Sequence, residues 1–274
     1  MSQAGLEGSY NFDLLAHPDV ESAHLEVRAQ LRLSGFPDLL RRHGFPDSGR
    51  VLEVGCGQGI RTKIMAELSP HAEVIGIDRS HAMVELTRSG LGAIHDNLSF
   101  EHADLYELPF PDDSFDFVYA RLVFMHLSKP LAALRSISRL LKPGGRVLIE
   151  DADRDCMFFE PQPENFATYW RLIQDGQRRL GGDPNVGRRL ASYLKEAGFE
   201  DLNIEVQPIV GDGADIEFMV RELLPSLRQY LQPQHHDYCE GAVRELLRLS
   251  RDPHATFFHF WFAVSGGKPL VGKI

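Results

Sequence analysis

Three glycines stand at alternate positions, Gly55, Gly57 and Gly59, between a short apolar run at 51–54 and a helix-like segment at 60–68. Strand, glycine turn and helix in this order bring backbone N–H groups close to a bound ligand. Glycine weakens strands and helices unless the backbone needs its freedom, so a purely structural turn is the less favoured interpretation. We therefore expect a nucleotide or nucleoside to bind at this turn.

The spacing of the glycines separates two kinds of cofactor. Dinucleotide-binding proteins carry G-x-G-x-x-G, whereas residues 55–59 follow G-x-G-x-G. The turn thus lacks the extra residue that helps the dinucleotide turn to fit a pyrophosphate. A nicotinamide-dependent oxidoreductase remains an alternative that this spacing disfavours.

An acid stands where a ribose would lie. Residues 73–78 are predicted to form the second strand, and Asp78 closes it nineteen residues after Gly59. A carboxylate at a strand's carboxyl end can accept hydrogen bonds from both ribose hydroxyls. The same spacing suits NAD enzymes, so Asp78 indicates a nucleoside without choosing the cofactor.

Strand-like and helix-like segments alternate along most of the chain, which favours an α/β fold. An acidic loop is expected at 151–155, directly after the fifth strand, and Met83 and Leu86 are expected to face the core. Expected strands lie at 51–54, 73–78, 98–105, within 108–118, and at 146–150, 202–209 and 257–264. Expected helices lie at 21–33, near 39–45, and at 60–68, 80–88, 130–141, within 158–180, and at 186–197, 214–231 and 238–249.

Composition narrows the class of protein. A chain of 274 residues with 43% hydrophobic residues suits one large α/β domain or a domain with an insertion. The net charge of −10 argues against a nucleic-acid partner. Cys56, Cys156 and Cys239 have no metal-ligand spacing and favour a reducing compartment. No secretory signal is visible, and 257–264 is too short to span a bilayer, so we expect a soluble cytoplasmic protein with no metal and no membrane partner.

These motifs, in this order, resemble the class I S-adenosylmethionine-dependent methyltransferases, specifically the ubiquinone/menaquinone-type and natural-product-like small-molecule branch. Glu-Val-Gly-Cys-Gly-Gln-Gly at 53–59 is similar to the family's first motif. Leu-Pro-Phe-Pro-Asp-Asp-Ser-Phe-Asp-Phe-Val at 108–118 and Leu-Lys-Pro-Gly-Gly at 141–145 are typical of its later strands. The likeness is strong over 50–152 and weak in the flanks.

The resemblance implies a Rossmann-like, doubly wound, seven-stranded sheet, mostly parallel, whose last strand is antiparallel. It also implies a methyltransferase domain at 50–274, preceded by an N-terminal helical cover at 1–49. Two segments outside the minimal pattern, near 153–185 and 212–251, are expected to be helical cap insertions. The sequence does not indicate the oligomeric state.

In this family the glycine turn wraps the amino-acid end and ribose of S-adenosylmethionine. Asp104 resembles the acid that accepts the adenine amino group, and an N-terminal tyrosine and a polar residue of the following helix fold over the methionine end. The implied cofactor contacts are Tyr10, Gln30, Glu53, Gly55, Gly57, Gly59, Asp78, Arg79, Met83, Ala103, Asp104, Leu105 and Arg121.

The expected reaction is transfer of a methyl group from S-adenosylmethionine to a small molecule. The sulfonium is already activated, so the protein must chiefly align the acceptor and exclude water. A hydroxyl, protonated amine or carbon acid also needs a base, for which His126, Asp151 and Asp153 are the candidates.

The acceptor's identity stays open at this point, as does the choice among O, N and C. Aromatic side chains of the two insertions, among them Phe158, Tyr169 and Phe218, are expected to line an apolar acceptor pocket. No Asn-Pro-Pro-Tyr or Asp-Pro-Pro-Tyr occurs, which disfavours methylation of nucleic-acid bases. A non-methylating S-adenosylmethionine-binding protein of the same fold remains an alternative.

Overall fold

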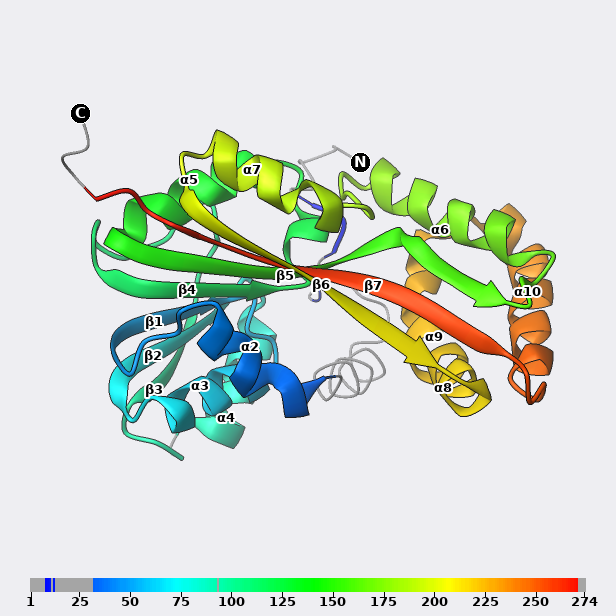
Figure 1. Cartoon of the computed structure of the whole chain (residues 1–274), viewed down its shortest axis with the longest axis horizontal. Coiled ribbons are helices and arrows are strands. Elements are labelled where there is room, and N and C mark those ends of the chain that lie inside the picture. The colour runs from blue at the N-terminus through cyan, green and yellow to red at the C-terminus, as the bar shows by residue number, and fades with distance from the viewer. Residues whose placement is uncertain (1–7, 11, 13–31, 93, 271–274) are drawn as a thin grey trace.

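The computed structural model describes residues 8–10, 12, 32–92 and 94–270 (Figure 1). Its sheet has seven strands in the order β3-β2-β1-β4-β5-β7-β6. Strand β7 runs antiparallel to β5 and β6, and the other pairs are parallel. The predicted doubly wound sheet with an antiparallel last strand is confirmed. The strands are β1 Ser48–Val54, β2 His71–Asp78, β3 Leu98–His102, β4 Phe115–Arg121, β5 Leu141–Glu160, β6 Glu200–Gly211 and β7 Thr256–Gly267.

Helices cover both faces of the parallel part. Neighbouring residues of β1 point to opposite sides, so Val51 packs with α2, α3 and α4 while Leu52 packs with α5 and α7. Leu86 of α4 is 52% exposed, contrary to expectation, whereas Met83 is buried. The helices are α2 Phe36–Arg42, α3 Ile60–Leu68, α4 His81–Leu91, α5 Pro130–Leu140, α6 Phe166–Arg179, α7 Leu190–Glu196, α8 Gly213–Phe218, α9 Leu224–Leu227 and α10 His236–Leu249.

Strand β5 is far longer than the predicted 146–150. It continues through residues 151–155, where an acidic loop was expected, and on to Glu160. Its pairing with β7 shifts register between Ala152 and Met157 and then resumes. The strand is thus paired with β7 on both sides of an irregular stretch that contains Asp153 and Asp155.

The far halves of β5, β6 and β7 extend beyond the parallel part and reach α6, α8, α9 and α10 (Figure 1). A separate apolar cluster fills this region, and it includes Phe159 of β5, Ile173 of α6 and Leu246 of α10.

The single helix predicted at 214–231 is divided into α8, a π-helical turn and α9, with Pro225 in the first turn of α9. Within the described residues, no helix is long and apolar enough to cross a membrane.

Helix α6 approaches the chain at Tyr230 so closely that only glycine fits. A Cβ added at Gly176 would overlap the Tyr230 carbonyl oxygen, whereas one added at Gly90 of α4 meets nothing within 4 Å. Neither glycine has a positive φ, so the two positions differ chiefly in available space.

We predict that Gly176→Ala lowers the free energy of unfolding by about 1–3 kcal/mol, because the added methyl group forces α6 away from Tyr230. The matched Gly90→Ala change is expected to leave stability equal or to raise it by up to ~1 kcal/mol, since alanine is the better helix former. Urea unfolding of both variants measures the difference. Equal stabilities would contradict the close approach.

Candidate functional site

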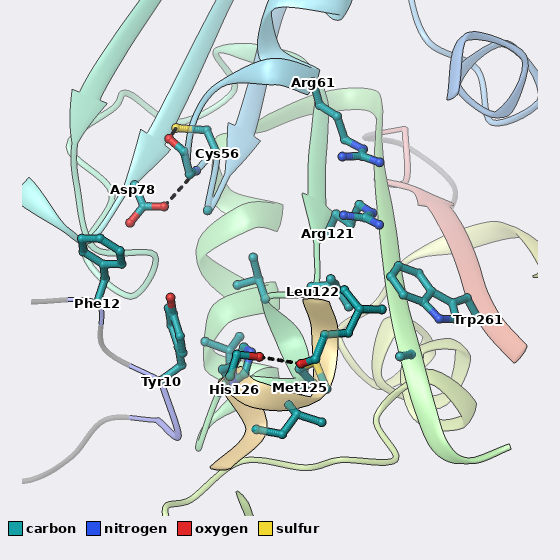
Figure 2. A pocket seen from close by; sticks show the side chains of 18 of the residues that line it. Tyr10, Phe12, Cys56, Arg61, Asp78, Arg121, Leu122, Met125, His126 and Trp261 are labelled. Atoms are coloured by element: carbon teal, nitrogen blue, oxygen red, sulfur yellow. Dashed lines mark hydrogen bonds between the residues drawn. The ribbon is translucent and has the colours of Figure 1, made fainter. Parts of the chain in front are cut away.

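A cavity of about 420 Å³ lies at the carboxyl ends of β1, β2 and β4 (Figure 2). It continues beneath the helices α6, α8 and α9, which together with α10 we call the cap helices or the cap. The chain order reverses at this place, because β1 and β4 are neighbours while β2 and β3 lie on the other side of β1. Open α/β sheets bind ligands at such switch points. Asp78 and Phe12 lie on one side of the cavity, and Arg121 and Trp261 lie on the other.

The glycine turn forms one wall, and its glycines have different tasks. All three have positive φ, of 68°, 51° and 71° in chain order. A Cβ at Gly57 would meet nothing within 4 Å, so its backbone borders open space, whereas a Cβ at Gly55 would lie 2.5 Å from Val123. Gly59 precedes α3, and a Cβ there would lie 2.6 Å from the Phe100 ring. The described lining includes Gly55 and Gly57 but not Gly59, whose role is to shape the turn.

Asp78 ends β2 and lines the cavity beside the glycine turn. Its Oδ2 accepts a hydrogen bond from the Gly57 N–H at 3.0 Å, and its Oδ1 accepts one from the Ser80 N–H at 2.9 Å. Ser80 in turn caps α4 by accepting from the Met83 N–H. A carboxylate offers about four acceptor positions, so these two bonds orient Asp78 while leaving it able to accept ribose hydroxyls.

Glu53 is the buried acid of the site. Thr62 donates its hydroxyl to Glu53 Oε2 at 2.5 Å, and Glu53 also lines the cavity. Burial raises the pKa of the Glu53 carboxyl from 4.5 to about 7, against the opposing effect of the Thr62 hydrogen bond. Across the site, Arg121 Nε is ion-paired with Glu150 Oε1 at 2.8 Å, and the Arg121 guanidinium carbon lies 4.7 Å from the centre of the Trp261 ring.

Most of the other cofactor residues inferred from the sequence lie together at the cavity. Asp104 is exposed and accepts from the Tyr106 N–H at 2.8 Å, which fixes its side chain at the rim. Gln30 falls outside the described residues. The remaining members that line the cavity are Tyr10, Arg79, Met83, Ala103 and Leu105.

His126 is the candidate base that reaches the cavity. It ends the 3₁₀ helix η3, Phe124–His126, directly after β4. The Ser9 hydroxyl lies 2.9 Å from His126 Nδ1, and the Tyr230 hydroxyl lies 3.5 Å from the same nitrogen. The ring of Tyr10 is 5.2 Å from the imidazole, so an N-terminal segment and the cap both hold this side chain.

Asp151 and Asp153, the two other candidate bases, are not among the described residues that line the cavity, and both side chains are fully buried. Asp151 accepts from the Met125 N–H at 3.0 Å, while Asp153 is ion-paired with Arg188. Placed on a continuing strand instead of an open loop, these acids hold structure: Asp151 supports η3, and Asp153 joins β5 to Arg188.

The acceptor side of the cavity differs from expectation. Phe218 lines it as predicted. Phe158 is 44% exposed and is not among the described lining residues; its ring stacks on the Phe258 ring, with 5.0 Å between the ring centres. Tyr169 is buried in the cap's apolar cluster and is not among the described lining residues. Trp170 and Tyr230, two further aromatic residues of the insertions, also line this side. Arg154, His259 and Trp261 line it as well and were not predicted from the sequence.

Comparison with known proteins agrees with this geometry. A family model described as a methyltransferase domain matches residues 52–149. The chain is 38% identical over 192 residues to the 27-O-demethylrifamycin SV methyltransferase of Amycolatopsis mediterranei, covering 68% of this chain and 66% of that protein. The chain spans between 39% and 58% of the length of the first curated relatives that it matches.

Two solved structures share the fold. Phosphoethanolamine N-methyltransferase 2 of Haemonchus contortus, in complex with phosphomonomethylethanolamine and S-adenosylhomocysteine, gives a TM-score of 0.63 at 20% identity, covering 97% of this chain and 60% of that chain. The [4+2]-cyclase SpnF gives a TM-score of 0.57 at 19% identity, covering 86% and 80%. At these identities the likeness shows the fold alone.

We predict that Glu53→Gln changes how stability depends on pH. As pH rises from about 4.5 to about 7, the unfolded Glu53 ionises while the native one keeps its proton. Wild-type stability therefore falls through this window relative to a glutamine that stays neutral at every pH. Thr62 can still donate to the glutamine carbonyl oxygen.

The stability of Glu53→Gln relative to wild type is expected to increase by an amount on the order of 2–3 kcal/mol between pH 4.5 and pH 8. Denaturant unfolding without ligand at both pH values measures this change, and the contribution of Asp151 cancels because both proteins contain it. A constant difference at all pH values would show that the native Glu53 pKa is not raised.

Proposed function

This chain belongs to the class I S-adenosylmethionine-dependent methyltransferases, and we propose that it transfers the methyl group of S-adenosylmethionine to a small-molecule acceptor. The observation that carries the proposal is Asp78, a carboxylate oriented by the Gly57 and Ser80 N–H groups at the cavity wall. A carboxylate that can accept hydrogen bonds from two ribose hydroxyls, beside an open glycine backbone, suits a nucleoside cofactor without a pyrophosphate.

The residues present fit the cofactor. Asp78 would bind the ribose, Asp104 the adenine amino group, and the open backbone at Gly57 would face the amino-acid end. Met83 and Leu105 are buried and would border the adenine. The cofactor supplies a methyl group on an activated sulfonium, which leaves the protein to position the acceptor and exclude water.

We assign His126 the role of base for an acceptor that must lose a proton. For Nε2 to take that proton, Nδ1 must carry the ring hydrogen and donate it to the Ser9 hydroxyl oxygen, and we propose this tautomer for the resting enzyme. Tyr10 and Tyr230 fix the imidazole from the N-terminal segment and the cap, respectively. Fixing the ring from two directions favours proton transfer in one geometry.

The acceptor half of the cavity favours a compound with a largely apolar body. Phe218, Leu224 and Phe257 line it together with Trp170 and Trp261. The net charge of −10 supports a small molecule over a nucleic acid, and one relative is named for the small-molecule acceptor 27-O-demethylrifamycin SV. We propose a cytoplasmic location on the grounds of cysteine usage.

The test is calorimetric titration with S-adenosylmethionine. Asp78→Ala is expected to weaken binding by roughly 2–4 kcal/mol, because two charge-assisted hydrogen bonds to the ribose are lost. Asp47→Ala, an exposed acid away from the cavity, serves as the matched control and is expected to bind like wild type. NADH, titrated in parallel, is expected not to bind.

Equal affinity of a folded Asp78→Ala protein and wild type would remove the assignment of Asp78. Release of S-adenosylhomocysteine on incubation with a panel of hydroxylated aromatic compounds tests the transfer itself. Tight cofactor binding without release for any acceptor would favour a non-methylating protein of this fold.

A further inference from the structure

Arg154 places a positive charge in a wall of the acceptor half that is otherwise mostly apolar. It lies in the register shift of β5, is 8% exposed and lines the cavity. Met157 of the same strand, Trp170 of α6 and Phe257 of β7 line this region with it. The charge of Arg154 also acts on the buried Asp151 carboxyl, where it opposes the rise in pKa that burial causes.

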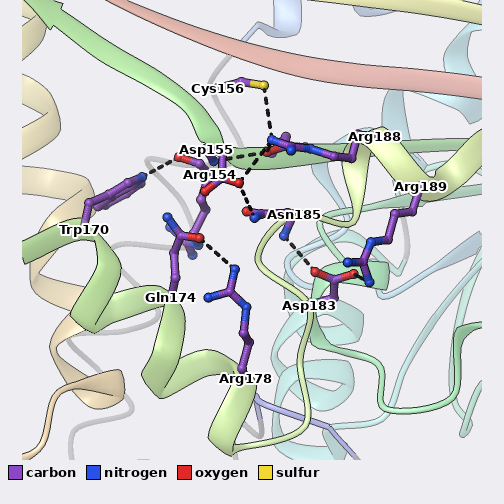
Figure 3. Close-up of polar contacts among 11 residues, drawn as sticks. Arg154, Asp155, Cys156, Trp170, Gln174, Arg178, Asp183, Asn185, Arg188 and Arg189 are labelled. Carbon is purple, nitrogen blue, oxygen red and sulfur yellow. Dashed lines mark hydrogen bonds and ion pairs between the residues drawn. The ribbon is translucent and has the colours of Figure 1, made fainter. Parts of the chain in front are cut away.

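The Arg154 guanidinium is held by two residues of α6. Its Nε donates to Gln177 Oε1 at 3.0 Å, and its guanidinium carbon lies 5.3 Å from the centre of the Trp170 ring. Trp170 also donates its indole N–H to the Arg154 carbonyl at 2.5 Å (Figure 3). Fixing Nε and the ring plane sets the direction of the planar fork that carries the two terminal nitrogens.

Gln177 links this arginine to the candidate base. The Gln177 side chain is fully buried, and its Nε2 donates to the Met125 carbonyl at 2.9 Å, one residue before His126. The amide therefore accepts from Arg154 and donates to η3 at the same time. A group bound by Arg154 would be held at a fixed position relative to His126.

His259 of β7 lines the same cavity and adds polarity without adding charge. Burial and the nearby charge of Arg154 lower the pKa of His259 to about 3, so its imidazole is neutral at physiological pH. Its Nδ1 accepts from the Trp261 indole N–H at 3.1 Å, which places the proton on Nε2. A contact with the Asp153 backbone opposes the fall of this pKa.

We propose that Arg154 binds a carboxylate of the methyl acceptor, so that the enzyme selects amphipathic acids with a largely apolar body. A planar guanidinium fork matches a carboxylate by two parallel N–H···O bonds, and the apolar wall would contact the rest of the molecule. Arg121, on another wall, is ion-paired with Glu150 and lies over the Trp261 ring. It is therefore not the arginine to which we assign the carboxylate. The proposal rests on the proposed function, because it names the acceptor of that site.

Binding of matched probes to protein saturated with S-adenosylhomocysteine tests this inference. The probes are 2-naphthoate, its uncharged counterpart 2-naphthamide, and 2-naphthyl phosphate, titrated by calorimetry. Wild type is expected to bind naphthoate at least tenfold more tightly than the amide and more tightly than the phosphate. Arg154→Met is expected to weaken naphthoate binding at least tenfold and to leave the amide within about threefold, and Arg154→Lys is expected to give an intermediate preference.

Arg178→Met is the matched control. Arg178 also hydrogen-bonds to a glutamine of α6, Gln174, but it is half-exposed and is not among the described residues that line the cavity. This variant is expected to keep the wild-type preference. Cofactor affinity, titrated separately, is expected to be the same in all the proteins. If wild type does not bind the cofactor, the proposed function is contradicted, and the result says nothing about the role of Arg154.

Four results would overturn the inference: equal binding of acid and amide by wild type, no binding of naphthoate by wild type, tightest binding of the phosphate, and a retained preference for the acid in Arg154→Met. The wild-type comparison needs no variant, and Arg154→Lys keeps the charge in place, so the proposal stays testable if Arg154→Met fails to fold.

Discussion

The antiparallel pairing of β7 with β5 fixes the parallel sheet and the cap helices relative to each other. It begins at Arg146 opposite Gly267, within the parallel sheet, and ends at Glu160 opposite Thr256, among the cap helices. The same pair of strands therefore runs through both parts of the molecule (Figure 1). Because β6 follows β7 over the same distance, the cap stands on an extension of the sheet itself.

A second link ties the two halves together at the Met125 peptide. Asp151 of β5 accepts from its N–H, and Gln177 of α6 donates to its carbonyl oxygen. The Asp183 N–H donates to the same carbonyl at 2.9 Å. The turn that ends at His126 is thus held by the sheet and by the cap at once, which couples the position of the candidate base to the packing of the acceptor wall.

The sequence was most informative where local chemistry determines structure. A glycine turn with positive φ and an acid at the end of the next strand are features that short-range spacing reveals, and Asp78 lies at the cavity as inferred. The glycine turn and Asp78 depend on contacts made within or just beyond a single βα unit. The antiparallel direction of the last strand was expected only from the resemblance to the methyltransferase family.

The acceptor half could not be read in the same way, because its contacts join distant segments. Residues 151–155 have the composition of a loop, yet they belong to a strand that pairs with β7 on both sides of the register shift, through Ala152 before it and from Met157 after it. Asp153 looked like a base but is paired with Arg188, thirty-five positions later. Arg154 stood unnoticed between two aspartates, since its partners Gln177 and Trp170 lie on α6.

We propose that one cavity across the β5–β7 pair holds cofactor and acceptor together, and a crystal structure with S-adenosylhomocysteine would test this arrangement. Both ribose hydroxyls are expected on the Asp78 carboxylate, with the sulfur facing the side lined by His126 and Trp261. A nucleoside bound away from Asp78, or a sulfur directed away from the cap helices, would contradict the proposal.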